Sequence, residues 1–139
     1  MIKTSIEDCG FALLAQKARE AMENAYCPYS NYRVGAAILA ASGQIYSGCN
    51  IENGSYGASN CAERTAVFKA VSEGEREFTA LAIFAEEGSA PPFPCGICRQ
   101  VLSEFCSRDM PIIIFDGERS VYNTNMEELL PYAFDLNAK

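Results

Sequence analysis

The sequence predicts an α/β fold in which helices cover a mixed β-sheet. Short apolar segments that are typical of strands alternate with segments that have helical periodicity. The first two strand-like segments are joined by Ser42-Gly43, and this short turn predicts an antiparallel hairpin within the sheet. No internal repeat, low-complexity run or linker interrupts the 139 residues, so residues 1–139 are expected to form a single domain.

The first part of the chain is expected to form one long helix followed by the hairpin. Ser5 and Asp8 resemble a capping box, and apolar residues recur after them with helical spacing. The helix is expected to stop only shortly before Pro28. The hairpin strands are predicted at residues 32–40 and 44–49, and a polar loop rich in Gly, Ser and Asn follows them.

The rest of the chain alternates between helices and strands. The predicted elements are a helix at 61–73, a strand at 79–85, a helix at 95–106, strands at 111–115 and 121–124, and a short helix at 125–130. Gly74 is expected to end the first of these helices, and Asn125 is expected to cap the last one. Helices placed between strands in this way imply layers of helix on a sheet.

The composition narrows the classes of function. The formal net charge is −7 at pH 7, whereas nucleic-acid binders concentrate Lys and Arg, so a small substrate is favoured over a polynucleotide. No apolar run approaches the roughly 20 residues of a membrane-spanning helix. Residues 1–8 also lack the basic and apolar segments of a signal peptide. We therefore expect a cytoplasmic protein that has no membrane partner.

Three cysteines and one glutamate form the chemically most informative pattern in the chain. Cys61 and Glu63 lie at one expected helix start, and Cys95 and Cys98 lie at another, where the helix dipole favours thiolate over thiol. We infer that the two helix starts face one point. Because the chain contains no histidine, three thiolates would leave a tetrahedral Zn²⁺ with one open position for a water. Glu63 is a candidate for moving the protons of that water, which indicates catalysis.

Spacing alone leaves other roles open for these residues. A single C-x-x-C also occurs in redox pairs and in structural zinc sites, where Cys49 or Cys106 would have to supply the fourth ligand. Glu63 at a helix start is equally suited to capping. Arg64 either offsets the negative charge of the thiolates or forms an ordinary surface ion pair. Outside a metal site, Cys9, Cys49 and Cys106 are expected to be core residues.

Several blocks of the sequence together resemble the small homotetrameric zinc-dependent cytidine deaminases. The cysteine motifs look like the three-cysteine form of the zinc-dependent nucleoside deaminase signature. The resembling blocks are Tyr26-Cys27-Pro28-Tyr29-Ser30, Val34-Gly35-Ala36-Ala37, Asn50-Ile51-Glu52-Asn53, Cys61-Ala62-Glu63-Arg64-Thr65-Ala66, Pro94-Cys95-Gly96-Ile97-Cys98-Arg99-Gln100-Val101-Leu102 and Glu128-Leu129-Leu130-Pro131. They follow the family's order from about Tyr26 to Phe134.

The resemblance implies a reaction and the residues that perform it. The reaction is the hydrolytic deamination of cytidine and 2′-deoxycytidine to the corresponding uridines, with release of ammonia, as a step of pyrimidine salvage. Cys61, Cys95 and Cys98 match the ligands of one Zn²⁺ per chain. Glu63 matches the proton shuttle, and Arg64 stands beside the ligands, where it would compensate the thiolate charge.

The resemblance also assigns residues to a nucleoside pocket. Asn50 and Glu52 match a pair that hydrogen-bonds the sugar hydroxyls, and Ala62 matches a substrate contact. Tyr32 stands where the family often has a phenylalanine that lines this pocket, and Arg33 stands where proline is common. These two positions depart from the family pattern.

The fold and assembly implied by the resemblance agree with the pattern of elements. The family fold is a three-layer α/β/α sandwich around a mixed five-stranded sheet. Tyr56 and Phe134 match aromatic positions that family members contribute from neighbouring subunits, so complete active sites would require a homotetramer.

The sequence leaves other functions open. A deaminase of the same fold acting on another aminopyrimidine-like compound, such as a nucleoside antibiotic, is the nearest alternative, although Asn50 and Glu52 favour a free ribose. A zinc-stabilised interaction module would use Glu63 only as a helix cap. The acidic charge argues against an editing enzyme that acts on polynucleotides.

Overall fold

Six strands form one mixed sheet in the computed structural model, which describes residues 2–4, 11–86, 88, 90–118 and 120–137. The strands are β1 (Ile2–Thr4), β2 (Val34–Ala40), β3 (Ile45–Cys49), β4 (Phe78–Ala85), β5 (Ile112–Asp116) and β6 (Ser120–Thr124). Their order across the sheet is β1-β6-β5-β4-β2-β3. Strands β4 and β5 pair in parallel, and the other pairs are antiparallel. The five predicted strands are present, and the prediction of a mixed sheet is confirmed.

Strand β1 was not predicted from the sequence. It pairs with β6 at the edge of the sheet, with Ile2 opposite Asn123. Three residues are too few to show the alternation that identifies a strand. The expected capping pair of Ser5 and Asp8 lies outside the described residues.

The predicted helices are also present. They are α1 (Ala12–Met22), α2 (Ala62–Ser72), α3 (Gly96–Phe105) and α4 (Met126–Leu129), with a short 3₁₀-helix, η1 (Tyr56–Ala58), before α2. Gly74 follows α2 with a φ of 100°, and the side chain of Asn125 accepts a hydrogen bond from the Glu128 amide at 3.0 Å, so both predicted helix ends are confirmed.

Helix α1 is shorter than predicted. It ends at Met22, whereas the sequence pattern continues to Ala25. The amides of Asn24 and Ala25 donate to carbonyls three residues back, which tightens the chain into turns. Tyr26 then pairs with Ile51 in an isolated β-bridge, so a tertiary contact ends the helical path.

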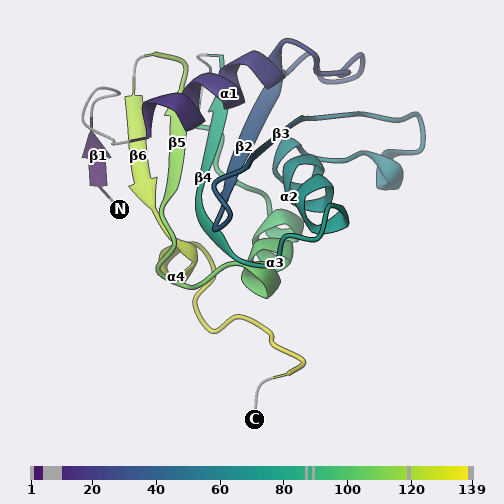
Figure 1. Ribbon diagram of the computed structural model, residues 1–139. Helices are drawn as coiled ribbons and strands as arrows, with labels where there is room; N and C mark the ends of the chain where they lie inside the picture. Colours follow the sequence, from purple (N-terminus) through teal and green to yellow (C-terminus); the bar gives the residue numbers. More distant parts are fainter. Residues whose placement is uncertain (1, 5–10, 87, 89, 119, 138–139) are drawn as a thin grey trace.

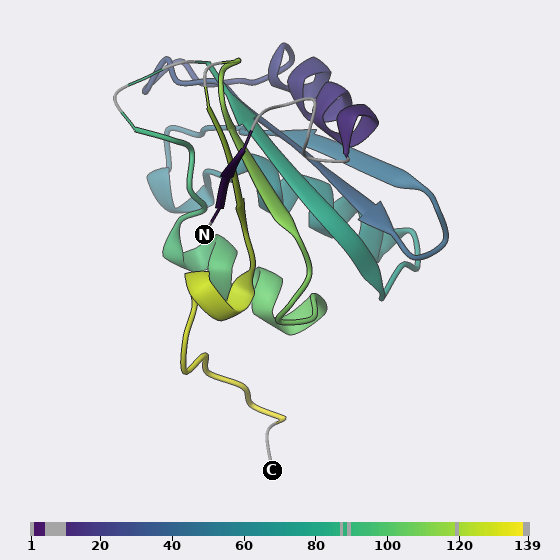
Figure 2. The ribbon, with the colours of Figure 1, turned by 90° about the vertical axis from the view of Figure 1, so that its left-hand side faces the viewer.

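Two layers of helix enclose the sheet. Helix α1 covers one face, where buried side chains such as Leu14, Phe84 and Phe115 form one core. Helices α2, α3 and α4 cover the other face around a second core that includes Val67 and Leu102. Figures 1 and 2 show α1 on one side of the sheet and these three helices on the other. The predicted three-layer α/β/α arrangement is confirmed.

The strand directions place two helix starts at the same end of the sheet. Strands β3 and β4 are both antiparallel to β2, so they run in the same direction. The chain leaves β3 at Cys49 to reach α2, and it leaves β4 at Ala85 to reach α3. Both helices pack on the same face and contact each other. Their N-termini therefore meet.

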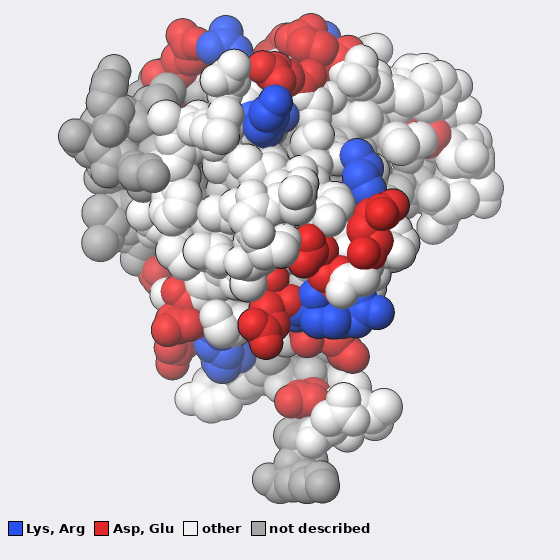
Figure 3. All heavy atoms as spheres, in the orientation of Figure 1, with Lys and Arg blue, Asp and Glu red and all other residues white. Residues whose placement is uncertain are grey.

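Two cysteines outside the metal motifs, Cys49 and Cys106, lie in the sheet and in the core packed on it. Cys106 is buried beside α3, which confirms its place in the core, and Cys49 is half-buried in β3. Cys9 lies outside the described residues. Acidic and basic side chains alternate on the face shown in Figure 3, without a continuous basic area. Within the described ranges, no helix has the length and apolar character needed to cross a membrane.

Candidate functional site

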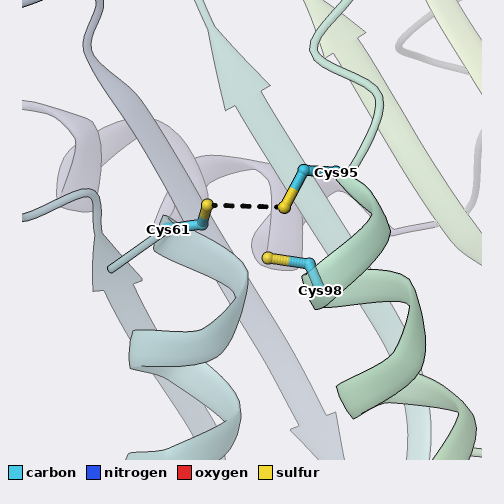
Figure 4. A group of neighbouring side chains, drawn as sticks. All are labelled: Cys61, Cys95 and Cys98. Carbon is cyan, nitrogen blue, oxygen red and sulfur yellow. Dashed lines mark hydrogen bonds between the residues drawn. The ribbon is translucent and has the colours of Figure 1, made fainter. Parts of the chain in front are cut away.

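Three cysteine thiols converge where α2 and α3 begin. Cys61 is the N-cap residue of α2, Cys95 is the N-cap residue of α3, and Cys98 lies in the first turn of α3. The Sγ atoms of Cys61 and Cys95 are 3.8 Å apart, and all three sulfurs lie within 4.8 Å of one another. Figure 4 shows the three side chains directed into the space between the two helices. The inference that both helix starts face one point is confirmed.

The cluster fits one zinc ion. Zinc–sulfur bonds of about 2.3 Å in a tetrahedron place the sulfurs about 3.8 Å apart, which matches the distance between Cys61 and Cys95. In the part of the chain that the structure describes, the group contains these three cysteines alone, so neither Cys49 nor Cys106 supplies a fourth ligand. Cys98 is fully buried and Cys95 is exposed, so the cluster is accessible from one side. This arrangement favours an open zinc site over a closed structural one.

Hydrogen bonds favour the charged form of the Cys61 thiol. They lower the pKa of Cys61 to about 5; the largest contribution comes from Cys98, and Arg64 adds another. Nη2 of Arg64 lies 3.3 Å from Cys61 Sγ. Burial acts to lower the pKa of Arg64, but its hydrogen bonds to Cys61 and Cys98 outweigh that effect and raise it. The guanidinium is thus directed at the sulfurs, and compensation of their charge stays a prediction.

Glu63 lies in the first turn of α2 and is almost completely buried, with a relative exposure of 5%. Burial raises the pKa of this carboxyl to about 7, because the charged form loses its hydration. A carboxyl with this pKa both accepts and releases protons near neutral pH. The carboxyl interacts with the thiols of Cys61 and Cys98, which places it next to the cluster.

A cavity of about 410 Å³ opens beside the cluster and is large enough for a nucleoside-sized ligand. Its wall is formed by Ser30, Tyr32, Val34, Asn50, Glu52, Tyr56, Gly57, Ser59, Asn60, Cys61, Ala62, Glu63, Arg64, Pro92, Phe93, Cys95 and Ile97. Most of the residues singled out from the sequence therefore lie together. Cys98 is buried outside the cavity wall, and Phe134 is not part of this wall in the single chain.

The polar side chains expected at the sugar are held by the chain itself. Glu52 accepts hydrogen bonds from the Tyr29 amide at 2.9 Å and from the amide and hydroxyl of Ser30 at 3.1 and 2.5 Å. Asn50 accepts from the Val34 amide at 2.9 Å and donates to the Tyr32 carbonyl at 2.7 Å. These contacts join separate segments of the chain, and the sequence did not indicate them. Contact with a sugar stays a prediction for both residues.

The aromatic positions have different surroundings. Tyr32 lines the cavity, and its pKa is raised by burial and by the nearby Asp116 and Glu63 carboxyls. Tyr56 lines the cavity of its own chain. Its ring packs edge-on against the ring of Tyr29, with the two ring centroids 5.7 Å apart. Phe134 is exposed on the C-terminal tail. A contribution of Tyr56 or Phe134 to a neighbouring subunit's pocket stays a prediction.

Several residues of the cavity wall were not identified from the sequence. Ser30, Asn60 and Phe93 come from three separate loops that the fold brings together. Phe93 lies two residues before Cys95, so its proximity to the motif was the available signal. Asn60 directly precedes Cys61, and Ser30 ends one of the blocks that resemble the family. Their residue type gave no sign of a place in the wall, because polar residues are common in loops of any kind.

Comparisons with known proteins agree with this site. Residues 12–114 match the cytidine and deoxycytidylate deaminase zinc-binding region. A cytidine deaminase of Sporosarcina psychrophila is 51% identical over 121 residues, which are 87% of this chain and 88% of that protein. A crystal structure of the cytidine deaminase from Burkholderia pseudomallei has a TM-score of 0.84 and 43% identity, and the match covers 89% of this chain and 98% of that chain. A blasticidin-S deaminase of Bacillus cereus is 31% identical over 115 residues, which are 78% of this chain and 81% of that protein.

Proposed function

Since the chain belongs to the cytidine and deoxycytidylate deaminase family, we propose that it hydrolyses cytidine to uridine and 2′-deoxycytidine to 2′-deoxyuridine. Water adds to C4 of the base, the bond from C4 to the exocyclic nitrogen breaks, and ammonia leaves. The observation that carries this proposal is the position of Glu63, which is buried beside the three-cysteine cluster on the wall of a nucleoside-sized cavity.

Glu63 moves the protons in this proposal. A zinc ion held by Cys61, Cys95 and Cys98 would supply an acidified water, because coordination lowers the pKa of water from about 15.7 toward 7. Glu63 accepts the proton and delivers it to ring N3, which makes C4 more electrophilic. The same carboxyl then gives a proton to the departing amine. A pKa raised to about 7 by burial suits both steps.

Arg64 adjusts the charge of the site. Three thiolates and Zn²⁺ carry a net charge of −1, which weakens the metal as a Lewis acid. The Arg64 guanidinium donates to Cys61 Sγ at 3.3 Å and so withdraws negative charge from the ligand.

Asn50 and Glu52 are the proposed sugar-binding residues. Each oxygen of a carboxylate has more than one acceptor position, and an amide nitrogen has two hydrogens, so the hydrogen bonds within the chain leave capacity for sugar hydroxyls. The same hydrogen bonds hold both side chains in place before substrate arrives. Binding therefore requires less loss of side-chain entropy.

A nucleoside fits the charge of the cavity better than a nucleotide. Among the described residues of the wall, Arg64 is the only cation, and it is directed at the cysteine sulfurs. Glu52 and Glu63 contribute carboxyls to the same wall. A phosphate group would meet like charge without a free cationic partner.

A nucleoside antibiotic is the second candidate substrate. The similarity to a blasticidin-S deaminase favours it, whereas Asn50 and Glu52 favour a free ribose. Parallel assays of cytidine and blasticidin S at equal enzyme concentration separate the two.

The proposed setting is pyrimidine salvage in the cytoplasm by a homotetramer. Tyr132, Phe134 and Leu136 are exposed apolar residues on the tail that extends away from the body in Figures 1 and 2. Exposed apolar side chains of this kind are typical of a segment that packs on a neighbouring subunit.

The change Glu63→Gln tests the proposed mechanism. The variant should fold and retain zinc, because the amide has the same shape, while deamination falls by about two to four orders of magnitude. Turnover is followed by ultraviolet absorbance and zinc by elemental analysis. Glu73→Gln, at the far end of α2, is the matched control and should keep wild-type activity. Near wild-type turnover in Glu63→Gln would remove this carboxyl from the mechanism.

A further inference from the structure

Arg99 connects the metal cluster to the C-terminal end of the fold. This residue lies in α3, one turn after Cys95, and its guanidinium is half-buried. Nε donates to the Pro94 carbonyl at 2.7 Å, and Nη1 donates to the Leu129 carbonyl at 2.7 Å. Arg99 does not line the substrate cavity. Its two contacts instead join the residue before a cysteine of the cluster to the last residue of α4.

The contact with Pro94 acts directly on Cys95. The carbonyl of Pro94 and the amide of Cys95 belong to one planar peptide unit, so holding the oxygen sets the orientation of that plane. The backbone amide of Arg99 also donates a hydrogen bond to the Cys95 carbonyl at 2.9 Å, which is the first helical hydrogen bond of α3. Residue 99 therefore holds the peptide units on both sides of Cys95. Cys95 is exposed to solvent, so these two hydrogen bonds restrict a residue that has little packing around it.

The contact with Leu129 gives the guanidinium a firm second support. Helix α4 is anchored by Met126, which is fully buried, and by Leu129, which is 6% exposed. The carbonyls at the C-terminal end of α4 lack helical hydrogen-bond partners, and Arg99 donates to one of them, that of Leu129. A planar guanidinium spans two acceptors with a fixed geometry, which a lysine ammonium does not reproduce.

Cys61 is held in a comparable way from its own helix. The amide and hydroxyl of Thr65 donate to the Cys61 carbonyl at 3.1 and 3.2 Å, and the Asn60 side chain donates to the Thr65 hydroxyl at 3.0 Å. In both helices the residue four positions after the N-cap cysteine supports that cysteine. The contacts of Thr65 stay at the start of α2, whereas Arg99 also donates a hydrogen bond to α4.

We propose that Arg99 is a positioning residue that holds the Cys95 thiol in the zinc site by bracing the Pro94 peptide against α4. The proposal rests on the zinc-dependent function given above. Loss of the brace frees the Pro94–Cys95 peptide and lowers the fraction of time in which the three sulfurs are correctly placed. Zinc then leaves faster, while the nucleoside contacts are unchanged.

The test compares Arg99→Met with Arg108→Met in the full-length zinc-loaded protein. Arg108 is the matched control, because its Nη2 contacts the neighbouring Leu130 carbonyl at 3.4 Å but does not contact Pro94. Zinc release to a colorimetric chelator is measured along with KM for cytidine and kcat. Arg99→Met should release zinc at least about tenfold faster, with unchanged KM and with kcat partly restored by added zinc. Arg108→Met should keep the wild-type release rate.

Two results would overturn the proposal. One is wild-type zinc release from folded Arg99→Met, and the other is equal acceleration in Arg108→Met. If Arg99→Met does not fold, Arg99→Lys replaces it and should release zinc faster than wild type, because one ammonium cannot bridge both carbonyls; an unchanged rate there refutes the brace. Wild-type protein that binds zinc without deaminating cytidine would refute the proposed function and leave the role of Arg99 intact.

Discussion

At the scale of single residues, the Glu52 carboxylate is held in place by the chain before any substrate binds. The hydrogen bond from the Ser30 hydroxyl is the largest factor that lowers the pKa of Glu52, and the amides of Ser30 and Tyr29 add to it. The carboxylate therefore stays ionised across the neutral range. The stabilisation that the ionised Glu52 carboxylate gives the folded chain is fully present above the ordinary pKa of glutamate. It is lost as the pH falls through the lowered pKa.

The change Ser30→Ala tests this support. Loss of the hydroxyl should leave the Glu52 carboxylate less firmly held, which raises KM for cytidine severalfold at nearly constant kcat. The pKa of Glu52 should rise, so the acidic limb of kcat/KM moves to higher pH. Steady-state kinetics across the acidic range measure both effects.

Ser42→Ala is the matched control for this experiment. The Ser42 hydroxyl donates to the Glu75 carboxylate at 2.6 Å, but neither residue lines the cavity. It should leave KM and the pH profile unchanged. An unaltered KM and acidic limb in Ser30→Ala would show that Glu52 needs no help from Ser30.

At the scale of elements, the position of α2 depends on a close approach to β3. A Cβ atom at Gly48 would lie 2.6 Å from the Ala66 amide nitrogen and 2.7 Å from Thr65 Cβ. The backbone of α2 therefore packs directly on the strand. Because α2 begins with Cys61 and carries Glu63, this contact sets where both residues lie.

The change Gly48→Ala should push α2 away from the sheet. We expect a loss of about 1–3 kcal/mol in the free energy of unfolding and less than one zinc per chain after dialysis. Denaturant unfolding and elemental analysis measure these two quantities. Gly96→Ala is the control, since a Cβ there meets no atom within 4 Å. Wild-type stability and zinc content in Gly48→Ala would contradict the packing argument.

The order of the elements from α1 to α4 could be predicted because each of the predicted helices and strands carries its own local pattern. The fully buried β5 is a continuous apolar run, and the start of α3 follows a proline. The end of α1 could not be predicted, because it depends on the bridge between Tyr26 and Ile51, which are distant in sequence. Strand β1 is defined by its pairing with β6 and has no local pattern of its own.

The chemical centre was predictable for a related reason. Three cysteines at helix starts in a chain without histidine have few roles, so Cys61, Cys95 and Cys98 could be grouped from spacing. The hydrogen bonds that support the site could not be predicted, because those of Asn50 and Arg99 join segments that only the fold brings together. The resemblance to a family indicated which residues belong to the site, and the structure shows which residues hold them by hydrogen bonds.

At the scale of the whole molecule, the C-terminal tail has little contact with its own domain. Tyr132 and Leu136 are 103% and 82% exposed, and the Phe134 carbonyl accepts a hydrogen bond from the Gln100 side chain at 3.1 Å. An exposed aromatic ring held by its backbone is available to a neighbouring subunit. The proposed tetramer gives this tail a binding partner.

A mixture of two impaired variants tests that role. Phe134→Ala should raise KM strongly, and Glu63→Gln should remove proton transfer. Coexpressed chains should form mixed tetramers in which an intact Glu63 site receives Phe134 from a Glu63→Gln neighbour, so part of the activity returns. Cytidine turnover of the purified mixture measures this recovery. No recovery in verified mixed tetramers would place Phe134 outside the shared site.

We propose that one zinc ion held by Cys61, Cys95 and Cys98 enables this chain to deaminate cytidine. The most direct measurement determines zinc per chain and cytidine turnover in one preparation, before and after a chelator and after zinc is restored. We predict one zinc per chain, turnover that falls in proportion to the zinc removed, and recovery on its return. Turnover that persists after complete removal of zinc, or a zinc-loaded chain that leaves cytidine unchanged, would contradict a zinc-dependent cytidine deaminase.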